Sequence, residues 1–312
     1  MSSDHHDHPE LPPPRTEEVA DDVFAYVQAD GSWFINNTGF VRGRRTVLCV
    51  DTCATERRTA ELLATLDRVA GPAPRTLVNT HHHGDHTNGN SMLPYAAVIG
   101  HERCRQEMVR TGILRYDGLF EPVEWGDLAL APPFITFEQR LTVHVDDVRV
   151  ELLHLTSAAH TTNDVVAWLP EQRVLFSGDL VLNGCTPFVL MGSVAGSLEA
   201  LDRIMELEPA VIVPGHGPPG GIEMVDLCGE YLRFVQQSAE RCSAAGLTPL
   251  EAARELDLGP YAELSDPERL AGNLHRAYAE HAGARPGDAI DLPAAMGDMI
   301  TLNGGRPLRC YA

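Results

Sequence analysis

The chain has no lysine, so all of its 24 Lys and Arg positions are arginine, and 44 acidic residues leave a net charge of −20. This charge argues against a nucleic-acid partner, because the phosphates would be repelled. No apolar run approaches the roughly 20 residues of a membrane-spanning helix, and the acidic start from Met1 to Pro9 lacks the apolar core of a secretory signal. We therefore expect a cytoplasmic protein with no nucleic-acid or membrane partner.

Cysteine is also scarce, and no two cysteines form a C-x-x-C pair. Their number is odd, and they are scattered along a chain in which no secretory signal is predicted. We interpret them as reduced thiols of a cytosolic protein. The seven cysteines are Cys49, Cys53, Cys104, Cys185, Cys228, Cys242 and Cys310.

Hydrophobic residues make up 44% of the 312 positions, which is ample for a sizeable core in one large domain or two small ones. Residues 1–18 are charged and proline-rich without an apolar period, which predicts a disordered tail. Residues 19–222 alternate between strand and helix signals, which predicts a layered α/β core. Residues 223–312 are helical in pattern and are predicted to form a C-terminal extension packed on that core.

Short apolar runs between Gly, Pro and Asp turns predict strands at 23–27, 33–40, 46–50, 75–79, 97–99, 142–145, 148–155, 165–169, 174–177 and 210–213. Apolar positions three or four residues apart predict helices at 55–69, 102–111, 197–206, 223–244, 248–256 and 267–282. Between 112 and 140 the pattern is irregular and rich in aromatic side chains. That insert suits a substrate wall, and ordinary packing explains it equally well.

The most informative motif is His81-His82-His83-Gly84-Asp85-His86, in which five of six residues can bind a metal. It follows the apolar run Thr76-Leu77-Val78, which is predicted to be a buried strand. Imidazole nitrogens and carboxylate oxygens are the ligands that zinc and its first-row neighbours take. A loop at the mouth of a strand suits a catalytic metal site, because the rigid element positions the ligands.

Three further ligand candidates stand at strand ends. His160 follows strand 148–155, Asp179 ends an apolar run in a Ser-Gly-Asp turn, and His216 lies in a Pro-Gly-His turn after strand 210–213. Each turn is weak evidence when taken alone. Together with the His-x-His-x-Asp-His motif, in this order and spacing, they form a strong metal signature.

This combination resembles the complete ligand set of the metallo-β-lactamase-fold superfamily. The resemblance covers about residues 20–220 and implies an αβ/βα four-layer sandwich, with two sheets face to face, helices outside and a metal site at one edge of the sheets. It also implies how the ligands are shared. His81, His83 and His160 would hold one metal, Asp85, His86 and His216 would hold a second, and Asp179 would bridge both.

Two divalent cations about 3.5–4 Å apart can share a water and lower its pKa towards ~7, which supplies a bridging hydroxide as nucleophile at neutral pH. Asp85 is expected to bind metal and also to accept a hydrogen bond from that hydroxide, as the catalytic residue. Two Zn²⁺ ions are expected, although the N/O ligand set would also accept iron or manganese. Asp51, which ends strand 46–50, is interpreted as orienting a ligand imidazole, with strand capping as the alternative.

A narrower likeness lies outside the metal motifs. The segments 165–179 and 186–201 resemble the metallo-β-lactamase-type second-ring cyclases of aromatic polyketide pathways, of the actinorhodin type, as do 25–28, 267–277 and 303–308. The resemblance implies a small-molecule substrate delivered on an acyl carrier protein. It also implies two steps at one metal site, aldol closure of a second ring and hydrolysis of the thioester.

A flat, apolar substrate of that kind would suit the aromatic insert. Asn273 and His275 differ by two positions on one predicted helix, so only one of them is expected to reach the cleft. Each substrate-pocket prediction has plain packing as its alternative. The predicted pocket residues are Tyr95, Asn183, Phe188, Asn273 and His275.

Two other functions stay open. A glyoxalase-II-like thioesterase or a lactonase would share the metal ligands, and the first of these would hold anionic glutathione through Arg233, Arg241 or Arg276 in place of lysine. A non-enzymatic metal-binding or docking protein with a vestigial site is hard to reconcile with seven intact ligands. The sequence leaves open whether the chain forms a homo-oligomer and what the helical extension does.

Overall fold

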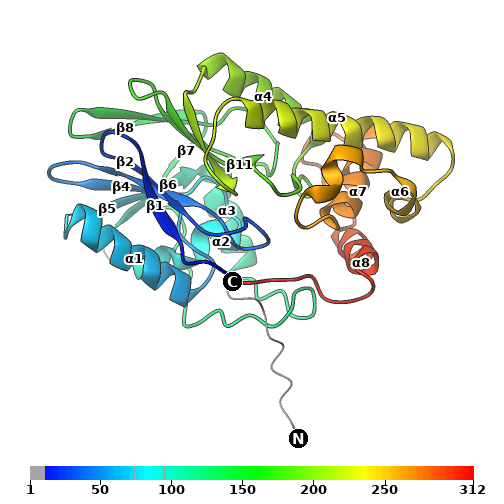
Figure 1. The fold of residues 1–312 in the computed structure, drawn as a ribbon, viewed down its shortest axis with the longest axis horizontal. Helices are drawn as coiled ribbons and strands as arrows, with labels where there is room; N and C mark the ends of the chain where they lie inside the picture. Colours follow the sequence, from blue (N-terminus) through cyan, green and yellow to red (C-terminus); the bar gives the residue numbers. More distant parts are fainter. Residues whose placement is uncertain (1–10, 74, 94–95) are drawn as a thin grey trace, which may run out of the picture.

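The computed structural model describes residues 11–73, 75–93 and 96–312, and two β-sheets form the centre of this part of the chain (Figure 1). The first sheet runs in the order β1-β2-β3-β4-β5-β6-β7, with bounds Arg15–Ala20, Val23–Val27, Thr38–Arg42, Val47–Val50, Arg75–Val78, Ala97–His101 and Ile135–Phe137. The second runs in the order β12-β11-β10-β9-β8, with bounds Val211–His216, Val174–Leu182, Val166–Leu169, Val148–Leu153 and Arg140–Val145.

Both sheets change from antiparallel to parallel pairing along their width. Strands β1 to β4 pair antiparallel, with the longer 28–37 loop between β2 and β3, whereas β4 to β7 pair parallel. Parallel neighbours need a crossover, which α1 (Glu56–Ala70) supplies between β4 and β5. Helix α4 (Val194–Leu207) does the same between β11 and β12. The carboxyl ends of parallel strands are therefore available for loops in both sheets.

Helix α1 covers the outer face of the first sheet, and its sequence explains where it begins and ends. The Thr55 side chain accepts a hydrogen bond from the backbone N–H of Arg58, which caps the first turn. Leu62 and Leu66 are buried on the inner face. Gly71, with φ 68°, ends the helix in a conformation that favours glycine.

Three apolar clusters mark the layers. One lies between the two sheets and includes Val41 and Leu152, and a second joins the first sheet to α1. The third lies on the outer face of the second sheet, under α4 and α5 (Glu223–Ala244). The chain therefore has the αβ/βα four-layer sandwich predicted from the resemblance.

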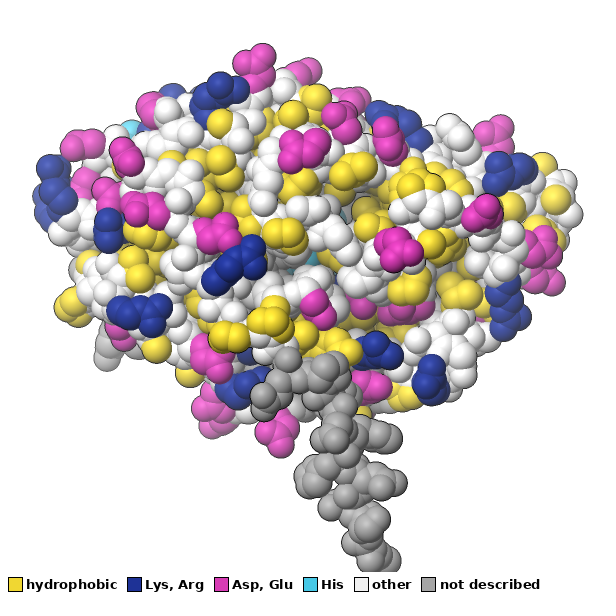
Figure 2. Space-filling view, in the orientation of Figure 1, with side chains coloured by type: hydrophobic (Ala, Val, Ile, Leu, Met, Phe, Trp, Pro, Cys, Tyr) yellow, Lys and Arg dark blue, Asp and Glu magenta, His cyan; other side chains and the backbone are white. Residues whose placement is uncertain are grey.

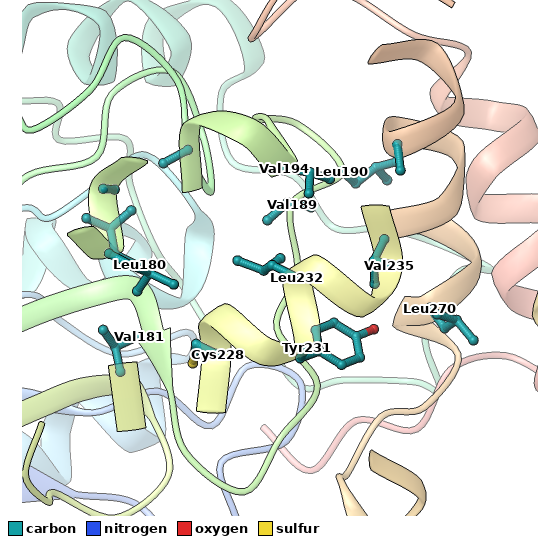
Figure 3. Close-up of a cluster of buried hydrophobic side chains, with 14 of the residues drawn as sticks. Leu180, Val181, Val189, Leu190, Val194, Cys228, Tyr231, Leu232, Val235 and Leu270 are labelled. Atoms are coloured by element: carbon teal, nitrogen blue, oxygen red, sulfur yellow. The ribbon is translucent and has the colours of Figure 1, made fainter. Parts of the chain in front are cut away.

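The C-terminal helices share the third cluster with the sandwich (Figure 3). Tyr231 and Leu232 of α5 pack with Leu270 of α7 (Arg269–His281) and with Val181 of β11. The remaining elements of this part are α6 (Pro249–Glu255), the 3-10 helix η2 (Gly259–Glu263) and α8 (Leu292–Leu302). Helix α5, which begins at the predicted boundary near residue 223, packs on the outer face of the second sheet, and the division of the chain at that residue stays a prediction.

Several sequence predictions need correction. The disordered tail was predicted to reach residue 18, but Arg15–Ala20 forms β1 and pairs antiparallel with β2; residues 1–10 lie outside the described residues. The strand predicted at 33–40 begins only at Thr38 and runs to Arg42, because Asn37 donates to the carbonyl of Pro214 in β12 and Asn36 donates to that of Thr52. Within the described ranges, no helix has the length and apolar character needed to cross a bilayer.

Candidate metal centre

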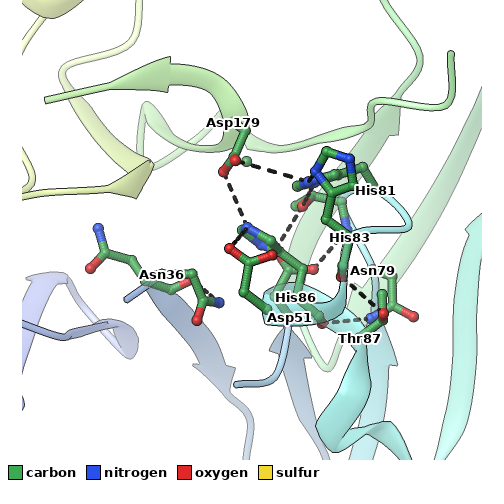
Figure 4. A network of polar contacts seen from close by, with 12 residues as sticks. Asn36, Asp51, Asn79, His81, His83, His86, Thr87 and Asp179 are labelled. Carbon is green, nitrogen blue, oxygen red and sulfur yellow. Dashed lines mark hydrogen bonds and ion pairs between the residues drawn. The ribbon is translucent and has the colours of Figure 1, made fainter. Parts of the chain in front are cut away.

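The His-rich motif and the later ligand candidates meet at one edge of the two sheets, and Figure 4 shows Asp179 facing His81, His83 and His86. His81 and His83 follow β5 of the first sheet, and Asp85 and His86 lie on the short helix α2 (Gly84–Thr87). Asp179 belongs to β11 of the second sheet, and His216 ends β12 beside it. His160 is supplied by the loop between β9 and β10.

Their ligand atoms form two adjacent groups. His81, His83, His160 and Asp179 make one group, and Asp85, His86 and His216 make the other, with the ligand atoms of each group within 4.8 Å of one another. In the first group, Nδ1 of His83 lies 3.0 Å from Nε2 of His81 and 2.9 Å from Nε2 of His160. In the second, Nε2 of His216 lies 3.2 Å from Oδ2 of Asp85.

Asp179 lies between the groups. Its Oδ2 is 3.4 Å from Nε2 of His160 in the first group, and its Oδ1 is 3.1 Å from Nε2 of His86 in the second. These residues fit a dinuclear metal site, and the assignment of each as a ligand stays a prediction. Zinc, iron and manganese all accept this N/O donor set.

Two orphaned atoms support the fit. Nε2 of His86 and Oδ1 of Asp179 are fully buried and face each other at 3.1 Å, but within the described part of the chain neither makes a hydrogen bond of good geometry. A buried polar atom without a partner costs about 1–3 kcal/mol. Both atoms point into the space between the two ligand groups, so a bound cation would satisfy them.

The charges of the cluster favour cation binding. Burial lowers the pKa of His81 and His83 well below the ordinary value, so both rings are neutral and have a lone pair for a metal. Burial also opposes charge on His86, but the carboxylates of Asp179 and Asp85 outweigh it and raise its pKa. Asp179 stays ionised because neighbouring imidazolium charge outweighs the effect of its burial on its pKa. Bound cations would supply this positive charge in place of protons.

The far nitrogens of three imidazoles are held by the surrounding protein. Oδ2 of Asp51 lies 2.8 Å from Nδ1 of His86, and the same carboxylate accepts hydrogen bonds from the N–H and hydroxyl of Thr80. His216 contacts the carbonyl of Gly31 at 3.1 Å, and His160 contacts that of Phe188 at 2.5 Å. Such contacts fix the ring orientation and tautomer of metal-binding histidines.

A cavity of about 290 Å³ opens onto the two ligand groups, and its wall is mainly apolar. Figure 2 shows a small area of histidine surface in a hollow near the middle of the molecule, with hydrophobic side chains around it. The wall combines residues from the 28–37 loop, the 112–131 insert, the loop after β11 and the C-terminal helices. Among them are Trp33, Phe34, Tyr116, Phe120, Phe188, Met191, Met296, Met299 and Leu308.

Of the five predicted pocket residues, one lines the cavity, three do not, and one lies outside the described residues. Phe188 lines the cavity. Asn183, Asn273 and His275 do not: Asn183 bonds to the carbonyl of Pro218, Asn273 holds the 187–189 loop, and His275 pairs with Asp298. Tyr95 lies outside the described residues.

Sequence reasoning missed several wall residues. No role was predicted for His82, but its side chain lines the cavity and contacts Asn163. Met296, Met299 and Leu308 come from the last helix and the chain that follows it. Only their apolar character was visible in the sequence, and that does not distinguish a cavity wall from a core.

Comparison with known proteins agrees with the fold. A family model described as the metallo-beta-lactamase superfamily matches residues 31–216. The chain therefore belongs to the metallo-β-lactamase superfamily, whose members are metal-dependent hydrolases.

Among curated proteins, a linear primary-alkylsulfatase from Pseudomonas is 23% identical over 83% of this chain. The chain spans only 59% of that protein's length. A type 2 metallo-beta-lactamase from Bacteroides fragilis is 24% identical over 67% of this chain and 81% of its own length. Both identities are low, so they do not assign a substrate.

Solved structures show the same fold. A metallo-beta-lactamase from Pontibacter korlensis superposes with a TM-score of 0.60 at 19% identity, covering 71% of this chain and 99% of its own. DIM-1 metallo-beta-lactamase superposes with a TM-score of 0.58 at 20% identity, covering 72% and 99%. These proteins are almost completely covered, whereas more than a quarter of this chain has no counterpart in them.

Proposed function

We propose that the chain is a dinuclear-metal hydrolase of acyl thioesters or related esters, and most specifically a cyclase/thioesterase. It would close a ring of a carrier-bound aromatic polyketide and release the product. The observation that carries this proposal is the apolar, aromatic cavity that opens onto both ligand groups. A flat acyl group in that cavity would present its thioester to the metal centre.

The two chemical steps place the same demand on the site. When bound, two divalent cations would activate a water as nucleophile and stabilise negative charge that develops on a substrate oxygen. Both the enolate of an aldol closure and the oxyanion of thioester hydrolysis carry that charge. The chain's part is to hold the ligands rigidly: Asp179 lies between the groups, and Asp51 orients His86.

The wall of the cavity suits an aromatic guest. Trp33 contacts Phe120 and Phe188 edge-on, at ring-centroid distances of 5.3 and 5.1 Å, so these rings hold one another in place. Met191 and Met296 add flexible apolar surface that adapts to the outline of a ligand. Pockets of this size and character bind drug-sized molecules through shape and a few polar contacts.

A carrier protein would deliver the acyl group past the rim of the cavity. Leu114 and Leu130 belong to its wall and are each 42% exposed, which places them at its mouth. We propose that the carrier arm enters there, with the thioester leading to the metals and the carrier body outside. Zinc as the resident metal, a cytoplasmic location and an acyl carrier partner all belong to this proposal.

The glutathione alternative gains no support from the arginines that were to hold it. Arg276 is buried and donates to the carbonyls of Leu190 and Asp288, and neither Arg233 nor Arg241 lines the cavity. A second candidate, cleavage of an alkyl sulfate ester, is favoured by one observation. The alkylsulfatase match extends over 83% of this chain, well beyond the ligand motifs.

The test is a product analysis with zinc-loaded protein. The substrates are a polyketide-like aromatic thioester of N-acetylcysteamine that retains a side chain able to cyclise, lactoylglutathione, a simple lactone and dodecyl sulfate. We expect the aromatic thioester to yield an acid that is one water lighter than simple hydrolysis would give. The Asp179→Asn variant serves as the control for turnover at this site. Fast turnover of lactoylglutathione or dodecyl sulfate, with the aromatic thioester intact, would contradict the proposal.

A further inference from the structure

Tyr116 stands out in the 112–131 insert because its neighbours face solvent while its own side chain turns inward. Arg115, Asp117 and Gly118 are exposed, whereas Tyr116 is half-buried and lines the cavity. Its backbone has φ 51°, in the left-handed region. A residue with a Cβ adopts that region at a cost of about 1–2 kcal/mol. Such strain concentrates at functional sites, where the surroundings hold it in place.

The ring of Tyr116 is held by other aromatic side chains. Its centroid lies 5.7 Å from that of Phe34 and 5.8 Å from that of Phe120, with the Phe120 ring nearly perpendicular. Phe120 is in turn bridged to Leu308 of the C-terminal segment, whose backbone bonds to that of Leu119. The position of the phenol is therefore set by both the insert and the end of the chain.

The hydroxyl of Tyr116 makes no hydrogen bond to any residue that the structure describes, and unlike that of Tyr26 it is not fully buried, so a ligand in the cavity can reach it. Buried tyrosine hydroxyls usually have a partner, as Tyr231 has in the side-chain amide of Asn273. Tyr26 is the other instructive case: its hydroxyl also lacks a partner among the described residues, but it lies in the core beneath α1. Of the described tyrosines, Tyr116 alone lines the cavity.

The environment keeps this phenol protonated. Burial raises the pKa of Tyr116 well above its ordinary value, and the nearby Asp85 carboxylate raises it further. Asp85 belongs to the second ligand group, so the phenol and the metal centre face the same space. At neutral pH the group is a hydrogen-bond donor on the wall of the cavity that opens onto the ligand cluster.

We propose that Tyr116 is a catalytic residue that donates its O–H to the substrate carbonyl oxygen as that oxygen becomes negative. No proton is transferred: the hydrogen bond shortens as charge develops, and it lengthens again when the thiolate leaves. The identity of that oxygen as a thioester carbonyl rests on the proposed function. A protonated donor of this kind complements bound cations, because it stabilises the charge from the opposite wall.

The test compares Tyr116→Phe with Tyr26→Phe, since each removes one unpartnered hydroxyl and leaves its ring in place. The probe is the N-acetylcysteamine thioester of naphthoic acid, hydrolysed by zinc-loaded protein. Removal of one donor to an oxyanion lowers kcat by about 100-fold. We expect that loss in Tyr116→Phe with KM and Tm little changed, and full activity in Tyr26→Phe. Equal kcat values for the two variants would overturn the proposal.

A second measurement separates this inference from the proposed function. The ketone in which a methylene group replaces the thioester sulfur cannot be hydrolysed but keeps the carbonyl oxygen, and its binding is followed by calorimetry. If wild-type protein leaves the thioester intact, the proposed function fails, and the ketone still tests Tyr116. We expect Tyr116→Phe to bind it about tenfold more weakly than Tyr26→Phe does. Equal affinities, or no binding to the wild type, would overturn the role of Tyr116.

Discussion

Gly215 offers a sharp perturbation of the metal centre, because it lies in β12 directly against Asp179 of β11. A Cβ at this position would overlap Oδ1 of Asp179 and lie 2.8 Å from the carbonyl carbon of Gly178. Ordinary contact between such atoms needs about 3.5 Å. In the Gly215→Ala variant, β11 and β12 must therefore move apart by about 0.7 Å to restore ordinary contact. The carboxylate of Asp179 must move further than that.

That displacement is larger than a metal site tolerates, since ligand distances hold to within about 0.2 Å. We expect Gly215→Ala to lose bound metal and, since misplacement by about 1 Å costs about 100-fold in rate, to lose activity on that scale. The overpacked strands should also cost about 1–3 kcal/mol of unfolding free energy. Metal content by plasma mass spectrometry, kcat and denaturant unfolding measure the three effects.

Gly297→Ala is the matched control. Gly297 lies within α8, and a Cβ added there meets no atom within 4 Å. Its substitution should leave metal content unchanged and raise stability by about 0.5–1 kcal/mol, the usual gain for alanine over glycine in a helix. A Gly215→Ala protein with full metal content and wild-type kcat would refute the view that Asp179 must stay between the two ligand groups.

Three further variants or treatments test the surroundings of the site. Asp51→Asn should weaken metal binding about 10- to 100-fold in a chelator competition, while Asp147→Asn, at an exposed position, should not. Arg276→Met leaves the carbonyls of Leu190 and Asp288 without their donor and should cost about 2–4 kcal/mol in denaturant unfolding; a loss below 1 kcal/mol would argue against that role. All seven cysteines are buried and free, and burial raises the pKa of Cys49, Cys53 and Cys185 to about 12. These three thiols therefore stay protonated through pH 9, and in native protein they should resist alkylation equally at pH 7 and 9, whereas rapid labelling of any of the three at pH 9 would contradict this.

Elements were predicted correctly from the sequence where the apolar residues repeat within the element itself. Elements were missed where their order depends on pairing with a distant segment. Helix α5 matches its predicted bounds, because apolar residues repeat along one face over 22 residues. Strand β1 was missed because its side chains are polar and only partly buried, and its order comes from pairing with β2. The apolar side chains at 33–35 led to the prediction of a strand there. Phe34 instead has φ 64°, which a strand does not allow, and it is buried in a loop.

The metal centre and the cavity differ in the same way. The ligand candidates stand in Gly- or Pro-containing turns at strand ends, and the resemblance of their order and spacing to the superfamily's ligand set implied that they meet. The cavity wall is assembled from an insert, a loop and the last helix, and its residues share only apolar character. Asn273 illustrates the limit: it lies near the cavity wall, yet its amide bonds to the carbonyl of Pro187 and the N–H of Val189 and thereby holds the loop that carries Phe188.

The central claim is that the two ligand groups hold two metal ions that the hydrolytic activity requires. The most direct test is to count metals per chain by plasma mass spectrometry during stepwise removal with a chelator, while thioester hydrolysis is followed in the same samples. We expect two ions per chain in zinc-loaded protein, loss of activity as they leave, and recovery when zinc is returned. Activity that persists in metal-free protein, or zinc-loaded protein that holds less than one ion per chain, would contradict it.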